Sequence, residues 1–226
     1  MGRVRRKAAG GVVYHALNRG NGRARIFHKA GDYDAFVRLL RDGQRLVPIR
    51  LLGFCLMPNH WHLVLWPFDD GDLSRYIGWV SNTHVKRYRE HYRDRGAGHL
   101  YQGRFKSFPV QDDYHLLTVL RYVEANPLRA RLAARADDWQ WSSFTTRARD
   151  GGEGLLSDWP LDRPADWGAT VEEVLDDGTL ANLRHSIDRG CPYGEESWTH
   201  RVAGLLGLAG TLLPRGRPGK VAAPQI

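Results

Sequence analysis

The 226-residue sequence predicts an α+β fold of the ferredoxin-like type, an antiparallel sheet with helices on one face. Segments with strand and helix periodicity follow one another in the order strand, helix, strand, strand, helix, strand, helix. Two consecutive strands are separated only by a short turn, which makes them an antiparallel hairpin. The apolar runs have the length of strands, and none is long enough to cross a membrane.

Turn and cap residues mark the first half of this pattern. Residues 11–17 form the first expected strand, and a polar turn over residues 18–22 ends it. The first helix is expected to begin at Asp32, a suitable helix cap, and to reach about residue 45. A strand over residues 49–56 then leads through a Met-Pro-Asn turn into a strand over residues 60–66. These two strands form the predicted hairpin.

The second half begins with a helix from Asp72 or Ser74 to about residue 92. A glycine-rich loop follows it and leads into a strand over residues 104–110. Asp112 precedes a third helix, which must end before Pro127 because the residue before a proline disfavours helical conformation.

The composition of the sequence changes near residue 147, where glycine, proline and aspartate divide it into short segments. We therefore expect a main domain over residues 8–146 and an accessory extension over residues 147–226. The extension has two modest helices, over residues 179–188 and 195–206, and a basic Pro/Gly tail over residues 214–220 that cannot form a core.

The charge balance favours nucleic acid as a partner. Thirty-three Lys and Arg against 25 Asp and Glu give a net charge of +8, and the excess lies in patches with aromatic residues between them. Arginine makes bidentate phosphate contacts and aromatic faces stack on unpaired bases, although a solvated basic surface is the alternative. The residues expected to contact nucleic acid are Arg19, Arg23, Arg25, Lys86, Arg87, Arg104 and Lys106.

The N-terminal segment and the two cysteines indicate the cellular compartment of the protein. The basic N-terminal segment has no apolar stretch of the kind that a secretory signal needs, so a cytoplasmic protein is expected. Cys55 lies in an apolar run and is expected to be buried, and Cys191 is far from it in the sequence. A disulfide scaffold is therefore not expected.

Two histidines occupy alternate positions of the strand predicted over residues 60–66. Because alternate side chains of a strand share a face, His60 and His62 are expected to face outward while Trp61, Leu63 and Leu65 pack under the helices. Two such imidazoles are close enough to chelate one divalent cation. Taken alone, the pair is more simply the polar half of an amphipathic strand.

The third predicted helix places Tyr122 and Asn126 four residues apart on one flank, beside an apolar stripe. Taken singly, they are an aromatic residue at the edge of the core and a helix cap before Pro127. Together with the histidine pair they suggest catalysis, since a phenol oxygen can attack a DNA phosphate that a bound cation polarises. Two imidazoles and one amide oxygen suit Mg²⁺ or Mn²⁺.

The stretches around these residues resemble the REP-associated tyrosine transposases, a branch of the single-tyrosine, His-hydrophobe-His transposases that act on single-stranded DNA. The resemblance covers roughly residues 10–145 well and the remainder loosely. It rests on MPNHWH at residues 57–62, YVEANPLRA at 122–130, YHALNRGN at 14–21, YQGRF at 101–105 and WQWSS at 139–143.

This resemblance implies a ferredoxin-like catalytic domain that cuts single-stranded DNA beside a palindromic hairpin. It implies a 5′-phosphotyrosine intermediate on Tyr122 and a free 3′-hydroxyl, so that cleavage and strand joining are both possible. His60 and His62 would hold the metal, and Asn126 stands where relatives have a glutamine as third ligand. The implied partner is hairpin-bearing single-stranded DNA, bound by a monomer or a homodimer.

Other readings stay open. The chain could be a catalytically silent DNA- or RNA-binding protein on the same scaffold, or a structural zinc protein, which would need a fourth ligand. Tyr101 is expected to stack on DNA or to close a loop. His15, His84 and His91 are expected to be DNA-facing or surface groups.

Overall fold

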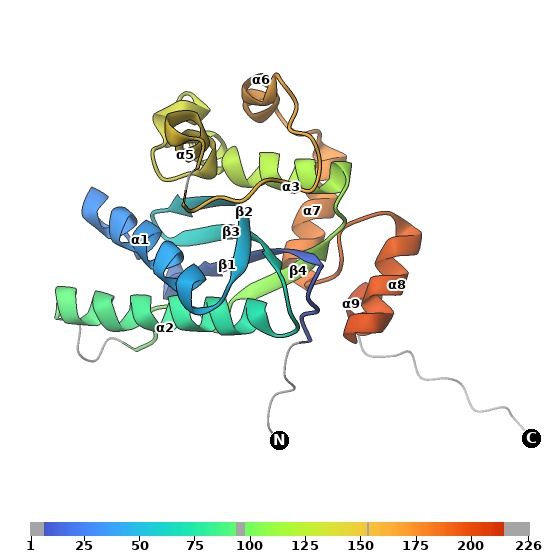
Figure 1. Cartoon of the computed structure of the whole chain (residues 1–226), viewed down its shortest axis with the longest axis horizontal. Coiled ribbons are helices and arrows are strands. Elements are labelled where there is room, and N and C mark those ends of the chain that lie inside the picture. Colours follow the sequence, from blue (N-terminus) through green and yellow to red (C-terminus); the bar gives the residue numbers. More distant parts are fainter. Residues whose placement is uncertain (1–6, 94–97, 153, 215–226) are drawn as a thin grey trace, which may run out of the picture.

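A computed structural model describes residues 7–93, 98–152 and 154–214. Four antiparallel strands form one sheet in the order β2-β3-β1-β4 (Figure 1). This strand order, with the chain order βαββαβ, confirms the predicted ferredoxin-like α+β fold. The strands are β1 (Val13–Arg19), β2 (Ile49–Met57), β3 (His60–Pro67) and β4 (Lys106–Val110).

The predicted hairpin is present between β2 and β3. Met57 pairs with His60, so that only Pro58 and Asn59 form the turn. β1 lies between β3 and β4 and extends to Arg19, two residues beyond the predicted end at residue 17. The residues expected to start a polar turn therefore belong to the strand, and Arg19 pairs with His60.

Two long helices, α1 (Ala30–Leu46) and α2 (Asp72–Tyr92), cover one face of the sheet (Figure 1). Trp61, Leu63 and Leu65 of β3 pack into the core on this face, as expected. Asp32 lies inside α1 rather than at its cap, where its carboxylate accepts hydrogen bonds from the backbone N–H groups of His28 and Lys29.

The opposite face of the sheet is covered as well, although helices were expected on one face only. There α3 (Tyr114–Glu124) packs on Leu52, Val64 and Phe108 in a second apolar core. Almost every residue of β2 and β3 is buried, and near-continuous apolar strands of this kind are typical of sheets covered on both faces.

Two features of β2 and α3 fix the position of α3. A Cβ atom at Gly53 would lie 2.6 Å from Leu120 Cδ2, so a larger residue there would force the Leu120 side chain to shift. The buried Glu124 carboxylate accepts hydrogen bonds from Ser143 Oγ at 2.5 Å and from Trp167 Nε1 at 2.7 Å. Glu124 points away from Tyr122, as its place on the helix predicts.

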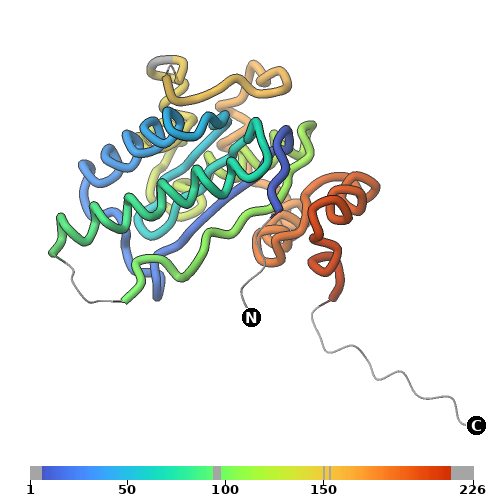
Figure 2. Tube along the Cα trace, turned by 60° about the horizontal axis from the view of Figure 1, so that its bottom comes forward, coloured from blue at the N-terminus to red at the C-terminus, as the bar shows by residue number. Residues whose placement is uncertain are grey.

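The extension contributes to the second core through Trp167, Val171, Leu175 and Leu183. The predicted helices there correspond to α7 (Asp177–Arg189) and α8 (Glu196–Leu206). Orange to red in Figure 2, α7, α8 and α9 gather at one end of the molecule, where α7 packs on β4. The division into domains at residue 146 stays a prediction.

Several short helices were not predicted, because their sequences are too brief to show periodicity. They are η1 (Asn21–Arg23), α4 (Asn126–Arg129), η2 (Ala136–Asp138), α5 (Ser143–Asp150), α6 (Trp167–Glu172) and α9 (Ala209–Leu212). The predicted basic tail, apart from Pro214, lies outside the described residues. Among the described helices, none combines the length and apolar character needed to span a membrane.

Candidate active site

The histidine pair lies on one face of β3, as its alternate spacing predicts. The ring centroids of His60 and His62 are 4.9 Å apart. Both side chains are buried, because their face of the sheet is the one that α3 covers, so the expectation that they face outward was wrong.

Burial determines the protonation of this pair. Desolvation, followed by the charges of Arg19 and Arg129, lowers the pKa of His60 to about 3. The pKa of His62 is also lowered well below its ordinary value, mainly by burial. Both imidazoles are therefore neutral near pH 7, and each has one nitrogen lone pair to offer.

The hydrogen bond of His60 determines which nitrogen has that lone pair. Its Nδ1 lies 2.6 Å from Asn59 Oδ1, and an amide oxygen can only accept. His60 therefore has its proton on Nδ1 and leaves Nε2 available to a metal. A ligand imidazole that donates its other N–H to an oxygen is the usual arrangement in metal sites, so His60 fits a metal.

Tyr122 reaches this pair from α3. Its ring is only 8% exposed and stands edge-on to the His62 ring, with 5.9 Å between centroids. Arg129 lies against the Tyr122 ring, with its guanidinium carbon 3.8 Å from the ring centroid. The structure thus brings the predicted nucleophile and the predicted metal ligands together from two different elements.

Asn126 belongs to the same cluster but has other contacts. Its Nδ2 donates to the carbonyl oxygens of Tyr122 at 3.0 Å and Val123 at 3.3 Å, so the side chain caps the end of α3. Its Oδ1 accepts from Arg129 at 2.9 Å. An amide oxygen has two lone pairs, so one acceptor position remains beside this bond.

Arg129 was missed by the sequence reasoning. It donates to the Tyr122 carbonyl at 3.0 Å as well as to Asn126, and thereby ties the last turn of α3 to α4. The predicted helix was expected to end before Pro127, so Arg129 on α4 fell outside it, although seven residues from Tyr122 is a helical spacing.

Two histidines expected on the surface are in the core instead. His15, on β1, is fully buried, and its Nε2 lies 2.8 Å from Nδ1 of His62. His84, on α2, is buried and bonded to the Tyr101 hydroxyl at 2.6 Å. That hydroxyl also accepts from Trp61 Nε1 at 3.0 Å, so Tyr101 closes its loop onto the core. His91 is exposed, as expected.

A cavity of about 670 Å³ opens beside Tyr122. Of the predicted DNA-binding residues, Arg19, Arg104 and Lys106 line it, and Arg184 of α7 adds a charge that was not predicted. The structure separates the others from it: Arg23, Arg25, Lys86 and Arg87 do not line this cavity.

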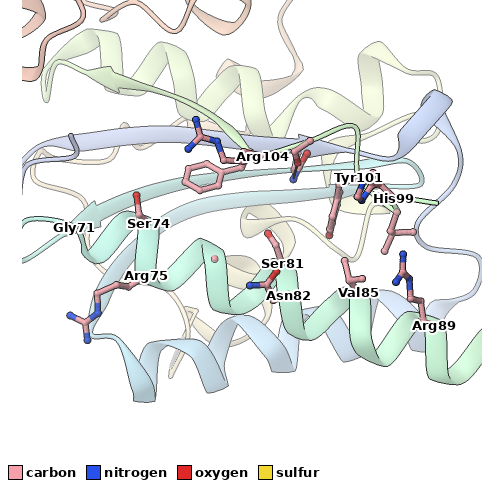
Figure 3. Close-up of a pocket in the computed structure, with 15 residues that line it drawn as sticks. Gly71, Ser74, Arg75, Ser81, Asn82, Val85, Arg89, His99, Tyr101 and Arg104 are labelled. Atoms are coloured by element: carbon pink, nitrogen blue, oxygen red, sulfur yellow. Dashed lines mark hydrogen bonds between the residues drawn. The ribbon is translucent and has the colours of Figure 1, made fainter. Parts of the chain in front are cut away.

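A larger groove of about 1050 Å³ lies between α2 and the segment over residues 98–105 (Figure 3). Arg75 and Arg89 of α2 line it, and Arg104 lines it from the opposite side. The groove and the Tyr122 cavity share the residues Asn18, Gly103, Arg104 and Phe105, so the two spaces adjoin.

Within the described ranges, no three His, Cys, Asp or Glu side chains are grouped to hold a metal ion. A structural zinc site of four such ligands is therefore not formed by these residues. The two imidazoles would need the Asn126 amide oxygen, or an oxygen of the substrate, to complete a site.

Comparison with known proteins gives a family match and a fold match. Residues 9–126 match the model of the IS200-like transposases. A solved REP-associated tyrosine transposase bound to a REP hairpin is similar to this chain with a TM-score of 0.52 at 22% identity, over 78% of this chain and 100% of that chain. This similarity shows a shared fold.

A putative transposase from Deinococcus radiodurans R1 is similar with a TM-score of 0.39 at 15% identity, over 58% of this chain and 89% of that chain. A search of the curated proteins found no match.

Proposed function

The chain belongs to the IS200-like transposase family, and from this premise we propose that it cuts and rejoins single-stranded DNA with Tyr122 as the nucleophile. One observation supports the proposal above the others. The Tyr122 ring lies against the histidine pair, 5.9 Å from the His62 ring, at the wall of a cavity with basic residues. A phenol, two neutral imidazoles and positive charge are the groups that phosphoryl transfer to a tyrosine needs.

The proposed reaction is a transesterification. The Tyr122 hydroxyl oxygen attacks the phosphorus atom and loses its proton, the bond from phosphorus to the 3′-oxygen breaks, and that oxygen takes up a proton. The products are a 5′-phosphotyrosine and a free 3′-hydroxyl. Attack by a 3′-hydroxyl of another strand reverses the step and joins DNA.

His60 and His62, with Asn126 as the third ligand, would hold a Mg²⁺ or Mn²⁺ ion. When bound, such an ion polarises the phosphoryl oxygens and offsets the charge that develops on them. Asn126 could serve only through the Oδ1 acceptor position that Arg129 leaves open. Arg19, Arg104 and Lys106 would neutralise the phosphates of the strand in the Tyr122 cavity.

We also propose hairpin-bearing DNA as the substrate. The similar solved structure is bound to a REP hairpin, and in this chain the groove of Figure 3 adjoins the Tyr122 cavity. A hairpin in the groove would place the single strand at its foot near Tyr122. Arg75, Arg89 and Arg104 provide the charges that a nucleic-acid backbone requires.

The test of this function is the covalent intermediate. A single strand that contains a palindromic hairpin, labelled at its 3′ end, should transfer its label to the protein. The same strand labelled at its 5′ end should release a fragment with a 3′-hydroxyl. Binding without any adduct or cleavage, over a range of palindromes and metals, would instead support the catalytically silent binding protein.

A second expectation concerns the form of the DNA. A hairpin-bearing strand should compete for the protein better than a duplex of equal sequence, because Tyr122 needs an unstacked backbone and partly buried Phe105 can stack only on unpaired bases. Equal competition by the duplex would show that the substrate class is wrong.

A substitution at Arg104 tests whether the groove is the surface that binds the hairpin. Because Arg104 lines both spaces, Arg104→Ala should weaken hairpin binding and lower the slope of its salt dependence by about one. Arg38→Ala is the matched control, since Arg38 is exposed on α1 and lines neither space. Equal effects of the two substitutions would mean that the groove is not the binding surface.

A further inference from the structure

His15 is in direct contact with one proposed metal ligand, and nothing in the proposed reaction uses it. We propose that His15 is a positioning residue, which accepts the proton of His62 Nδ1 when a metal binds and thereby leaves His62 Nε2 free for the metal. The proposal rests on the proposed function only in taking His62 as a metal ligand.

The two rings are held in a defined geometry. The His15 Nε2 and His62 Nδ1 atoms are 2.8 Å apart, and the ring planes differ by 17°. Phe108 of β4 packs on His15 with 5.0 Å between ring centroids. His15 is 0% exposed, and two ring nitrogens at this distance attract each other only if one has a proton and the other has a lone pair. One proton is therefore shared between the two facing nitrogens.

Two arrangements of that proton are possible, because a neutral imidazole has one N–H and one lone pair. If His15 Nε2 donates, His62 has its own proton on Nε2 and cannot bind a metal there. If His62 Nδ1 donates, His62 Nε2 is free for the metal and His15 has its proton on Nδ1. His60 has no such choice, because its partner Asn59 Oδ1 only accepts.

When no metal is bound, the surroundings of His15 Nδ1 favour the arrangement in which His15 Nε2 donates to His62 Nδ1. Its Nδ1 is buried and has no hydrogen-bond partner among the described residues. An N–H without an acceptor is rarer in proteins than an acceptor without a donor, so a lone pair is the better occupant of Nδ1. A metal held by His62 Nε2 would require this bond to reverse: the shared proton would move to His62 Nδ1, and the proton displaced from His62 Nε2 would be balanced by one taken up at His15 Nδ1. No proton is released in total.

Substitutions at position 15 distinguish a positioning role of His15 from a packing role. Phenylalanine at position 15 fills nearly the same space but cannot accept a proton, whereas glutamine can. His15→Phe should therefore weaken Mn²⁺ binding by the full chain by about 10- to 100-fold. His15→Gln should stay within a few-fold of wild type. The thermal midpoint of the metal-free Phe variant should fall only slightly, because the substitution removes one unpaired buried nitrogen but also leaves His62 Nδ1 without its partner.

The matched control is His84→Phe, which makes the same change at another buried histidine, whose contacts include Tyr101, Phe27, Phe36 and Tyr88. Its Mn²⁺ affinity should equal that of wild type. A Phe variant at position 15 that binds Mn²⁺ as tightly as wild type would overturn the proposal. A His62→Ala variant that does so would overturn the proposed metal site itself.

A direct measurement is the ¹⁵N spectrum of the histidine rings with and without Zn²⁺, a diamagnetic probe. His62 should change from the Nε2–H to the Nδ1–H form on binding Zn²⁺, and His15 should change with it. Binding through His62 Nδ1, or an unchanged His15, would contradict the inference while leaving the metal site in place.

Discussion

The substitution Tyr122→Phe is expected to abolish strand cleavage, a loss of at least about 10⁴-fold, while DNA affinity and folding stability stay nearly unchanged. The change removes one hydroxyl and keeps the ring that packs against His62 and Arg129. Cleavage of a labelled hairpin-bearing strand, fluorescence anisotropy with the same strand, and thermal unfolding measure the three quantities.

Tyr114→Phe is the matched control for this experiment, because Tyr114 stands on the same helix but is 59% exposed in its first turn. That variant should cut like wild type. Normal cutting by the Tyr122 variant, or a covalent adduct on Tyr101 or Tyr114, would refute the assignment. Tyr101 is a poor candidate, since its hydroxyl is buried between Trp61 and His84.

The local part of the site could be predicted from the sequence because it depends on short-range geometry. The period of a strand is enough to place His60 and His62 on one face, and the period of a helix is enough to place Tyr122 near Asn126. The hairpin, the long helices and burial of Cys55 follow from similarly local signals and are confirmed.

The remainder depends on tertiary arrangement that no local pattern contains. His15 was expected to face DNA or solvent, but β1 lies inside the sheet between β3 and β4 and is almost entirely buried. Its contact with His62 follows from the pairing of β1 with β3, which the sequence does not display. Arg129 contacts Tyr122 from α4, beyond Pro127, where the sequence predicts that the helix has already ended.

The arginines that these contacts bring to the histidine pair give the proposed cation site a positive charge. Arg19 and Arg129 lie close enough to lower the pKa of both histidines, and no carboxylate offsets them among the residues that line the Tyr122 cavity except Asp188, which is 3.5 Å from Lys106. A scissile phosphate would supply the missing negative charge. Metal and DNA are therefore expected to strengthen each other's binding.

Removal of the metal is expected to affect DNA cleavage far more than DNA binding. Cleavage is expected to require added Mg²⁺ or Mn²⁺, and His60→Ala and His62→Ala should each remove it. DNA binding should fall only modestly, because the arginines of the cavity and groove provide most of the phosphate contacts. Both histidines are buried, so His62→Gln, which keeps more of the side-chain volume, is tested beside the alanine variants.

His84→Ala is the control that separates chemistry from folding, since it deletes an equally buried histidine on the other face of the sheet. If it cuts at the wild-type rate under conditions where it remains folded, the loss in the His60 and His62 variants comes from the site. Titration with a chelator gives the independent measurement, and activity should disappear as free metal is removed and return when Mn²⁺ is restored. Undiminished cleavage in excess chelator would rule out the metal mechanism, and Tyr122 would then have to act with basic side chains such as Arg19 and Arg129 in place of a metal.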